Sequence, residues 1–327
     1  MLIPFADKLD EGDMKVLKVG DKDDQKVLVA RYQGKLYSTG NFCSHFGVPL
    51  NNGMLFDDKV LCPAHAAGFS IITGKPETAP GLDGIPSFPV VEKDGSWFVQ
   101  IPQEGLPRKV PMPLTKRDPN NNTHYVIIGG GPAGLNCAET LRQSGFSGKV
   151  TILAAEKAIP YDRTLLSKAI AVGDASKFAL RPAEFLTEAD IDFKEKKKVF
   201  NVKPEEKKVI CYDGEKIIYD KLLVATGTYA WAPPIPGIDL PGVFKLRTGE
   251  DQAKIKEACK DAKKIIVIGA SFVGSECAAA LKMHYKDTVD IKMIDGEDTP
   301  FKLTLGKELG AFYAKEHAEN GVNIITS

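Results

Sequence analysis

The chain has 327 residues, with 43 basic and 43 acidic side chains and therefore no formal net charge. This length allows two or three domains with cores of their own. The balanced charge gives no indication of a nucleic-acid or anionic-membrane partner, and no apolar run approaches the roughly 18 residues of a spanning helix. Residues 1–15 mix Asp, Glu and Lys and lack both a signal-peptide core and an Arg-rich transit sequence, so we expect a cytoplasmic protein.

The first region, residues 1–103, consists of short β-rich runs separated by turn residues. The runs are MKVLKVG, QKVLVARY, KLYSTG, KVLC, FSII, SFPVVE and SWFVQI. Short apolar runs bounded by Gly, Pro, Asn and Asp are typical of strands. We therefore predict a small antiparallel β domain.

Two loops of this domain each carry one thiol and one imidazole: Cys43 with His45, and Cys62 with His65. Thiolate and imidazole suit both a tetrahedral zinc ion and a two-iron cluster. A Cys2His2 finger places its histidines on a helix, whereas both pairs here lie in Gly- and Pro-rich sequence. One Cys and one His per loop allow both cysteines to bind one iron and both histidines the other. We predict a [2Fe-2S] cluster, with structural zinc as the alternative.

The spacing C-x-H, about sixteen residues, C-x-x-H resembles a Rieske [2Fe-2S] domain. Val48 and Ala64 occupy the positions at which respiratory and photosynthetic Rieske proteins have cysteines that form a disulfide. Ala67 and Phe69 align with a Ser and a Tyr that donate hydrogen bonds to the cluster in those proteins. Fewer donors disfavour the reduced, more negative cluster, so the resemblance implies a potential in the lower part of the range of about −150 to +300 mV.

Residues 104–122 form a different kind of sequence. The stretch from Pro102 to Asn122 contains five prolines, scattered charge and no apolar period. This composition is typical of a semi-rigid linker.

A dinucleotide-binding pattern begins at residue 123. A hydrophobic run, a Gly-rich turn and an amphipathic run lead into the strand KVTILAAE, with Gly129, Gly131 and Gly134 as G-x-G-x-x-G. These glycines permit a tight turn, close approach to a pyrophosphate and close strand–helix packing. Glu156 ends the next predicted strand, where an acid that binds a ribose is expected. We assign residues 123–250 as the first segment of an FAD-binding domain.

The same pattern returns in residues 251–327. The turn has Gly269, Ser271 and Gly274, and the acid is Asp295 or Glu297. An acid at this place favours a free ribose 2′-hydroxyl, hence NADH over NADPH. The alternative is a Rossmann-shaped fold without ligand, because Ser271 replaces the middle glycine that must approach the phosphates.

Cysteines outside the two loops form no redox-active pair in the sequence. They are well separated and occur in no C-x-x-C or C-x4-C arrangement: Cys137, Cys211, Cys259 and Cys277. We expect them to be small buried hydrophobic side chains rather than a dithiol beside a flavin.

The segment PYDRTLLSK, with Tyr161, Arg163 and Lys168, is similar to a motif of the FAD- and NADH-dependent reductases that include oxygenase-coupled ferredoxin reductases and apoptosis-inducing factor. The resemblance implies that Arg163 lies by the FAD phosphates. It places Lys168 near the reactive face of the flavin, where a cation stabilises the reduced anion. Thr164 and Leu165 replace two prolines of the motif, so the geometry of this loop is expected to differ.

Two further parts of the chain match this reductase family. Ala225, Thr226 and Gly227 follow a predicted strand and complete the expected FAD-binding set. Glu276 corresponds to a family glutamate near the nicotinamide. The resemblance therefore names Lys168 and Glu276 as the catalytic pair.

A Rieske domain ahead of such a reductase resembles the arrangement of the apoptosis-inducing factor 3 (AIF-like) proteins. It implies a multidomain fold, with a small antiparallel β domain followed by α/β FAD- and NAD(P)-binding Rossmann-like domains. The implied cofactors are a [2Fe-2S] cluster, FAD and NADH. The sequence stops at VNIITS, at an expected third strand of the second nucleotide fold. We therefore expect an incomplete NADH-binding domain, weak flavin retention and exposed apolar surface.

The first functional hypothesis is an oxidoreductase in which electrons pass from NADH through FAD to the cluster and on to an unidentified acceptor. The second is a redox-responsive cell-death signalling protein, which the family resemblance alone implies. The third is a cluster-binding module on a degenerate, non-catalytic reductase. A homodimer is the candidate assembly, and a mitochondrion-associated location is the alternative to the cytoplasm.

Overall fold

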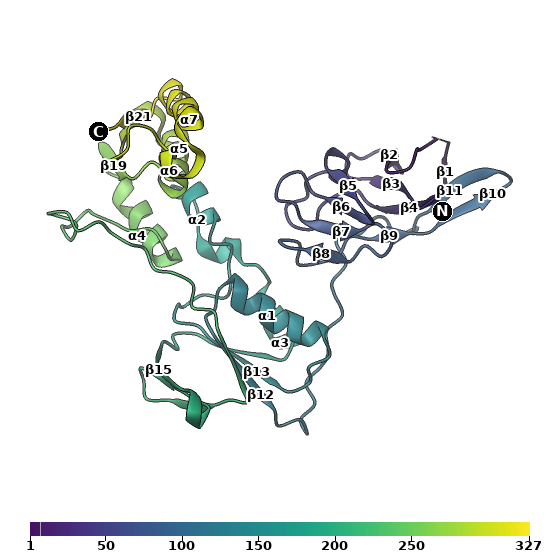
Figure 1. The fold of residues 1–327 in the computed structure, drawn as a ribbon, viewed down its shortest axis with the longest axis horizontal. Helices are drawn as coiled ribbons and strands as arrows, with labels where there is room; N and C mark the ends of the chain where they lie inside the picture. The colour runs from purple at the N-terminus through teal and green to yellow at the C-terminus, as the bar shows by residue number, and fades with distance from the viewer. Residues whose placement is uncertain (7) are drawn as a thin grey trace. The chain divides into compact units, whose positions relative to one another are not determined.

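The computed structural model describes residues 1–6 and 8–327, which separate into two compact units, Met1–Pro113 and Leu114–Ser327 (Figure 1). The division falls inside the segment 104–122 that the sequence marks by its prolines. No helix in the described residues has the length and apolar character needed to cross a membrane. Each unit is described on its own below.

The first unit contains three antiparallel sheets. Their strand orders are β1-β11-β10, β2-β3-β4-β9 and β5-β6-β7-β8. The strands are β1 (Leu2–Phe5), β2 (Met14–Lys18), β3 (Lys26–Tyr32), β4 (Lys35–Gly40), β5 (Met54–Phe56), β6 (Lys59–Leu61), β7 (Gly68–Ser70), β8 (Pro76–Thr78), β9 (Ser87–Phe88), β10 (Val90–Lys93) and β11 (Ser96–Gln100), with a 3-10 turn at Leu50–Asn52. The predicted small antiparallel domain is confirmed.

Strand β3 separates two apolar cores of this unit. Val27 and Val29 pack into one core, while Leu28 and Ala30 pack into the other. Successive side chains of a strand point to opposite faces, so the four consecutive apolar residues of β3 can serve both cores. The second core also contains Cys43 and Cys62, so it supports both ligand loops from beneath.

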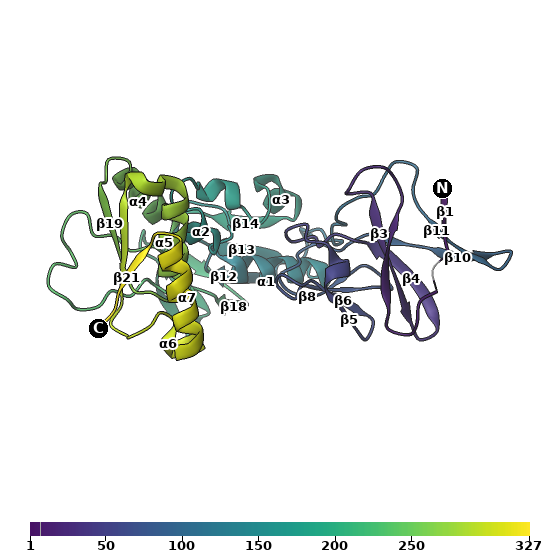
Figure 2. The ribbon, with the colours of Figure 1, turned by 90° about the horizontal axis from the view of Figure 1, so that it is seen from above.

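The first half of the second unit is a parallel sheet with the order β14-β13-β12-β18. Helix α1 packs on β12 and β13, and α3 packs on β14 (Figures 1 and 2). A small antiparallel sheet, β15-β16-β17, adjoins it. The elements are β12 (His124–Ile128), α1 (Pro132–Gln143), β13 (Lys149–Leu153), α2 (Leu165–Lys168), α3 (Ala183–Glu188), β14 (Ile191–Lys194), β15 (Val199–Lys203), β16 (Lys208–Cys211), β17 (Lys216–Ile218) and β18 (Lys221–Val224), with 3-10 turns at Ala175–Phe178 and Pro204–Glu206.

The second half of this unit repeats the design with a smaller parallel sheet, β19-β20-β21. Helix α5 packs on β19 and β20, and α7 contacts β21. The elements are α4 (Gly249–Cys259), β19 (Lys264–Ile268), α5 (Phe272–Tyr285), β20 (Asp290–Ile294), α6 (Lys302–Leu305), α7 (Lys307–Glu319) and β21 (Asn323–Ile325), with a 3-10 turn at Lys286–Thr288. The predicted strand–turn–helix–strand repeat is confirmed.

One predicted strand is shorter than expected. The run KVTILAAE suggests a strand that ends at Glu156, but β13 ends at Leu153. The pairing changes at Ala154, whose N–H donates to Lys194 and whose carbonyl accepts from Lys197 at 2.8 Å. Glu156 therefore lies in the turn that follows the strand.

Candidate functional site

The structure brings the four predicted cluster ligands together as two pairs, Cys43 with Cys62 and His45 with His65. Each loop turns back on its cysteine: Gly47 N–H donates to the Cys43 carbonyl at 2.8 Å, and Ala66 N–H donates to the Cys62 carbonyl at 3.0 Å. Gly47 and Ala66 both have positive φ, at 69° and 56°. The two imidazole rings of His45 and His65 lie edge to face with 5.1 Å between their centroids.

The two thiols are buried side by side, and the imidazoles lie nearer the surface. Burial, with a smaller effect of the neighbouring Cys62, raises the pKa of the Cys43 thiol to about 11. The backbone N–H groups of His45 and Phe46 point to the Cys43 sulfur and act in the opposite sense. A thiolate pair at this place needs a bound positive charge.

The chemical types of the donors fit a two-iron cluster. Two sulfurs lie next to each other, two imidazoles lie next to each other, and amide groups donate to one sulfur. Within the described residues, no group of three or more His, Cys, Asp or Glu side chains is placed to hold a metal ion. The assignment of Cys43, His45, Cys62 and His65 as ligands accordingly stays a prediction. If a cluster binds, the cysteines hold the buried iron and the histidines the outer one.

Hydroxyl groups fasten the two ligand loops to their surroundings. Ser44 Oγ donates to the Asp83 carbonyl at 2.7 Å, which ties down the first loop. Thr78 Oγ1 donates to the Ala66 carbonyl at 3.1 Å and accepts from Gly68 N–H at 2.7 Å, which ties down the second. All six cysteines of the chain are free, so hydrogen bonds hold these loops.

Ala67 and Phe69 lie fully buried beside the second loop. Neither side chain offers a hydroxyl donor at the position where a Ser and a Tyr are expected in high-potential Rieske proteins. This arrangement supports the prediction of a low cluster potential.

The first Gly-rich turn connects β12 to α1. Gly129 has φ 125°, and a Cβ on it would lie 2.1 Å from the Ala225 carbonyl oxygen. A Cβ on Gly134 would lie 2.0 Å from the Gly129 carbonyl oxygen. Gly131, at the N-terminus of α1, has no atom within 4 Å of a Cβ position, so the helix end faces open space. An open helix N-terminus beside a tight glycine turn fits a pyrophosphate.

Glu156 and Arg163 form an ion pair beside this turn. Arg163 Nη2 lies 2.8 Å from Glu156 Oε1, and Tyr161 donates from its hydroxyl to Glu156 Oε2 at 2.7 Å. Burial, then the bond to Glu156, raises the pKa of Tyr161 to about 12, so the phenol stays protonated. The structure thus places the predicted ribose acid and the predicted phosphate-binding cation in direct contact.

The segment Ala225–Gly227 follows β18 directly and lies against the first turn. Ala225 N–H donates to the Ile128 carbonyl at 2.8 Å. Thr226 follows, and a Cβ on Gly227 would lie 3.1 Å from Arg247 Nη2. The three predicted residues therefore border the same site as Gly129.

The second Gly-rich turn connects β19 to α5. Gly269 has φ 97°, and a Cβ on Gly274 would lie 1.9 Å from the Gly269 carbonyl oxygen. Ser271 caps α5 with φ −91°, a conformation open to any residue. Asp295 follows β20 directly and accepts the N–H of Ala270 in the turn. Of the two predicted acids, Asp295 lies at the turn.

The Glu297 N–H donates to Asp295 Oδ1 at 2.9 Å, while the Glu297 side chain pairs with Lys302, with 3.0 Å between Oε2 and Nζ. The ribose-binding role of Asp295 remains a prediction.

Lys168 and Glu276, the predicted catalytic pair, meet between the two nucleotide folds. Lys168 Nζ lies 3.0 Å from Glu276 Oε1, and Ser167 Oγ donates to Glu276 Oε2 at 2.6 Å. Both residues of the pair line a cavity of about 310 Å³, as do Arg163 and Phe272. The arrangement joins the residues predicted for the flavin to those predicted for the nicotinamide.

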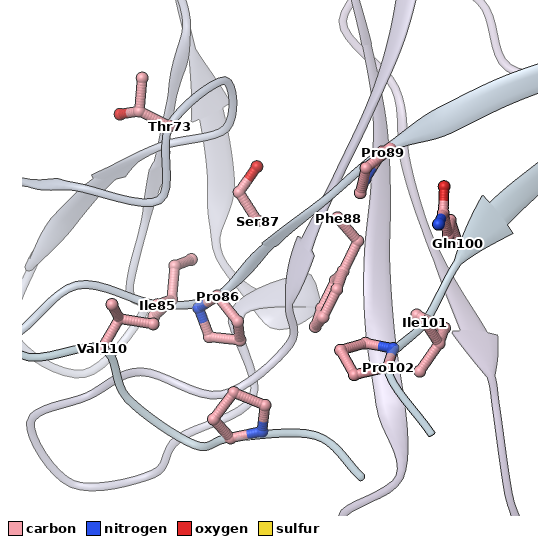
Figure 3. Close-up of a pocket in the computed structure, with 11 residues that line it drawn as sticks. Thr73, Ile85, Pro86, Ser87, Phe88, Pro89, Gln100, Ile101, Pro102 and Val110 are labelled. Atoms are coloured by element: carbon pink, nitrogen blue, oxygen red, sulfur yellow. The ribbon is translucent and has the colours of Figure 1, made fainter. Parts of the chain in front are cut away.

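A cavity of about 480 Å³ in the first unit has a different character. Figure 3 shows that Pro86, Phe88 and Pro102 project into it, and its lining includes no ionisable side chain. None of the four predicted cluster ligands lines it. It therefore offers no group for acid–base or redox chemistry.

These features define a class of architecture: two dinucleotide-binding folds that follow a small β domain with paired Cys and His loops. Comparison with known families agrees, since residues 1–89 match the Rieske [2Fe-2S] domain and residues 123–327 match the pyridine nucleotide-disulphide oxidoreductases. The chain belongs to the pyridine nucleotide-disulphide oxidoreductase family and carries a Rieske domain ahead of it. The Rieske domain implies a [2Fe-2S] cluster, and the ferredoxin-reductase relatives imply FAD and NADH.

Relatives cover the chain to different extents. It is 34% identical to human apoptosis-inducing factor 3 over 322 residues, which is 96% of this chain and 52% of the relative. It is 35% identical to rhodocoxin reductase from Rhodococcus erythropolis over 201 residues, 61% of this chain and 46% of the relative. The structure of a ferredoxin reductase from Rhodopseudomonas palustris matches with a TM-score of 0.59 at 27% identity, covering 63% of this chain and 50% of that one. The chain thus spans about half the length of these relatives.

Three residues of the site escaped the sequence analysis as functional candidates. Tyr161 bonds Glu156, Arg163 and the N–H of Gly249. Arg247 accepts from Arg163 at its carbonyl, and Ser167 bonds Glu276. The position of Ser167 beside Lys168 in PYDRTLLSK was a usable signal for that residue, whereas Arg247 had none.

Proposed function

We propose that the chain is part of an NADH-dependent flavoprotein that passes electrons to its Rieske cluster and on to an acceptor outside the chain. The observation that carries this proposal is the meeting of Lys168 and Glu276 in one cavity between two dinucleotide-binding turns. When bound, FAD supplies the conversion of a two-electron hydride into single electrons.

The residues of the cavity have separate tasks in this proposal. Lys168 holds a positive charge beside the flavin, where it stabilises negative charge on the reduced ring. Glu276 orients the nicotinamide ring. Arg163 and the turn at Gly129–Gly134 hold the FAD diphosphate, and Asp295 with the second turn holds the nucleotide of NADH.

Cysteines outside the ligand loops do not compete for the electrons. Burial raises the pKa of Cys277, adjacent to Glu276, to about 12, and burial also raises the pKa values of Cys137, Cys211 and Cys259. Such thiols are poor nucleophiles. The cluster is therefore the proposed route out of the flavin.

An anaerobic titration with NADH tests this proposal. Flavin bleaching is followed optically and the [2Fe-2S] signal by electron paramagnetic resonance, with a Cys62→Ser variant as the control that lacks the cluster. We expect NADH to reduce both centres in the wild-type chain and the flavin alone in the variant. A cluster that is reduced by dithionite but never by NADH would refute the relay and favour a cluster-binding module on a non-catalytic reductase.

The acceptor and the cell-death role are separate proposals. A small electron carrier or an oxygenase is the acceptor class that agrees with the ferredoxin-reductase relatives. A role in cell death has support only in the name apoptosis-inducing factor 3, which a human and a mouse relative share. Survival assays in cells that carry His45→Cys test it, and unchanged survival would count against it.

A further inference from the structure

Two neighbouring residues of α2 hold both oxygens of one carboxylate on α5. Ser167 Oγ donates to Glu276 Oε2 at 2.6 Å, and Lys168 Nζ lies 3.0 Å from Glu276 Oε1. Because a separate donor fixes each oxygen, the carboxylate plane is held in one orientation. A hydrogen bond to a charged acceptor is among the stronger ones in proteins.

Both donors also reach a second acceptor, the carbonyl of Thr164. Ser167 Oγ lies 3.3 Å from this oxygen, and Lys168 Nζ lies 3.2 Å from it. The ammonium group has three hydrogens and can serve both acceptors at once, whereas the hydroxyl has one hydrogen and must choose. The Ser167 hydroxyl can therefore donate either to Glu276 or to the Thr164 carbonyl, but not to both at once.

The Thr164 carbonyl is itself fixed in place. Asp162 Oδ1 accepts from the Thr164 N–H at 2.9 Å and from its hydroxyl at 2.7 Å. A proline at position 164 could donate neither bond. Thr164, which replaces the first proline of the motif, thus holds the loop by hydrogen bonds to Asp162, whereas a proline would hold it by the rigidity of its ring.

Burial shows how Ser167 acts. Ser167 and Glu276 both line the cavity, but Ser167 is only 5% exposed, whereas the Glu276 side chain is 32% exposed. A bound nucleotide would therefore contact mainly Glu276, with most of Ser167 behind it.

We propose that Ser167 is a positioning residue that presents Glu276 to the carboxamide of the nicotinamide ring; this rests on the proposed function. When the carboxamide donates to Glu276, the Ser167 hydrogen stays on a remaining lone pair or moves to the Thr164 carbonyl. Neither outcome leaves a buried donor without an acceptor, which would weaken binding. Ser167 thus orients the Glu276 carboxylate before the nucleotide binds, and it can give up its hydrogen bond to Glu276 when the carboxamide binds.

The test is the dissociation constant for NAD⁺, measured by calorimetry on the full chain with FAD bound. Ser167→Ala should raise it about fivefold, and Ser167→Thr, which restores the hydroxyl, should return it to within about twofold of wild type. Ser176→Ala is the matched control, because the Ser176 hydroxyl donates to the exposed Asp174 at 2.8 Å and does not line the cavity of Lys168 and Glu276. It should leave the constant unchanged.

A second readout separates positioning from a structural role. The midpoint potential of the flavin should fall in Lys168→Ala, which removes a cation, and stay unchanged in Ser167→Ala. Equal dissociation constants for wild type and Ser167→Ala would overturn the proposal. A rise accompanied by a changed flavin potential or by lost FAD would overturn it as well.

NAD⁺ binding and cluster reduction are independent measurements. If Ser167→Ala binds NAD⁺ more weakly but NADH never reduces the cluster, the relay fails and the role of Ser167 stands. If NADH reduces the cluster and wild type and Ser167→Ala bind NAD⁺ equally, the relay stands and the role of Ser167 is refuted.

Discussion

The two Gly-rich turns of the second unit share one spacing and differ in their surroundings. The first turn is enclosed, because β18 runs beside β12 and brings the Ala225 carbonyl to within 2.1 Å of a Cβ on Gly129. The second turn is open: no atom lies within 4 Å of a Cβ on Gly269. In the described part of the chain, β19 is an edge strand, and Ile266 and Ile268 are 51% and 56% exposed.

The comparison separates the glycines that serve the fold from those that serve a ligand. The third glycine of each turn, Gly134 or Gly274, faces a carbonyl oxygen within 2.0 Å of its Cβ position. The middle residue has ordinary backbone in both turns, with φ −96° at Gly131 and φ −91° at Ser271. The fold therefore requires the third glycine, and only a close ligand can require the middle one.

The largest effect on stability is expected at the third glycine, which both turns share. Gly134→Ala and Gly274→Ala should each lower the free energy of unfolding by about 3 kcal/mol or more, because the backbone oxygen must move. Urea unfolding of the variants measures this. Gly131→Ala is the control, since its Cβ meets nothing. Unfolding curves equal to wild type would show that the turns relax freely.

The next effect concerns the ligand at the first turn. Gly131→Ala should raise the dissociation constant for FAD at least tenfold while the free energy of unfolding of the FAD-free chain changes by less than about 1 kcal/mol, because a methyl group would stand where the pyrophosphate lies. Flavin fluorescence during titration reports binding. Gly296→Ala, also in open space, should bind FAD as wild type does. Unaltered FAD affinity in Gly131→Ala would place the diphosphate elsewhere.

A smaller effect is expected at the acid of the second turn. Asp295→Asn keeps one oxygen that can accept from Ala270 N–H, loses the second oxygen that accepts from Glu297 N–H, and removes a charge that repels a 2′-phosphate. The preference for NADH over NADPH, measured as the ratio of the two dissociation constants, should fall about tenfold. Glu297→Gln should not change the ratio, because Glu297 pairs with Lys302. A wild-type protein that prefers NADPH would contradict the assignment of Asp295.

The smallest effect is expected at the middle residue of the second turn, where Ser271 stands in place of the glycine of the first turn. Ser271→Gly should lower the dissociation constant for NAD⁺ about two- to fivefold, since it removes a side chain near the phosphates, and it should cost less than about 1 kcal/mol of stability. Calorimetry and urea unfolding measure the two quantities. A weaker affinity after the substitution would mean that the Ser271 hydroxyl binds the phosphates itself.

Local patterns in the sequence predicted most of this architecture. The glycine spacing, the alternation of the strands and the paired Cys and His loops each depend on residues close together in the chain. Strand β8 was missed, since Pro76–Thr78 offers three residues and no alternation. The end of β13 was misplaced because Ala154 bonds both Lys194, the last residue of β14, and Lys197 in the turn that follows β14.

Contacts within the candidate site were harder to predict. Ser167 and Glu276 are 109 residues apart, and only the packing of α2 on α5 brings them together. The ion pair of Glu156 with Arg163 joins two residues that were predicted to bind different parts of the dinucleotide, its ribose and its phosphates. Such pairings depend on side-chain rotation, which a motif does not encode.

The hydroxyl groups of Ser44 and Thr78, which tie down the two ligand loops of the first unit, affect how the protein responds to thiol reagents. A covalent clasp between the ligand loops would open in a pool of glutathione or after treatment with dithiothreitol. The bonds from Ser44 to Asp83 and from Thr78 to Ala66 contain no sulfur, so thiol reductants leave them intact. A thiol reductant therefore does not remove the bonds that tie the two loops to their surroundings.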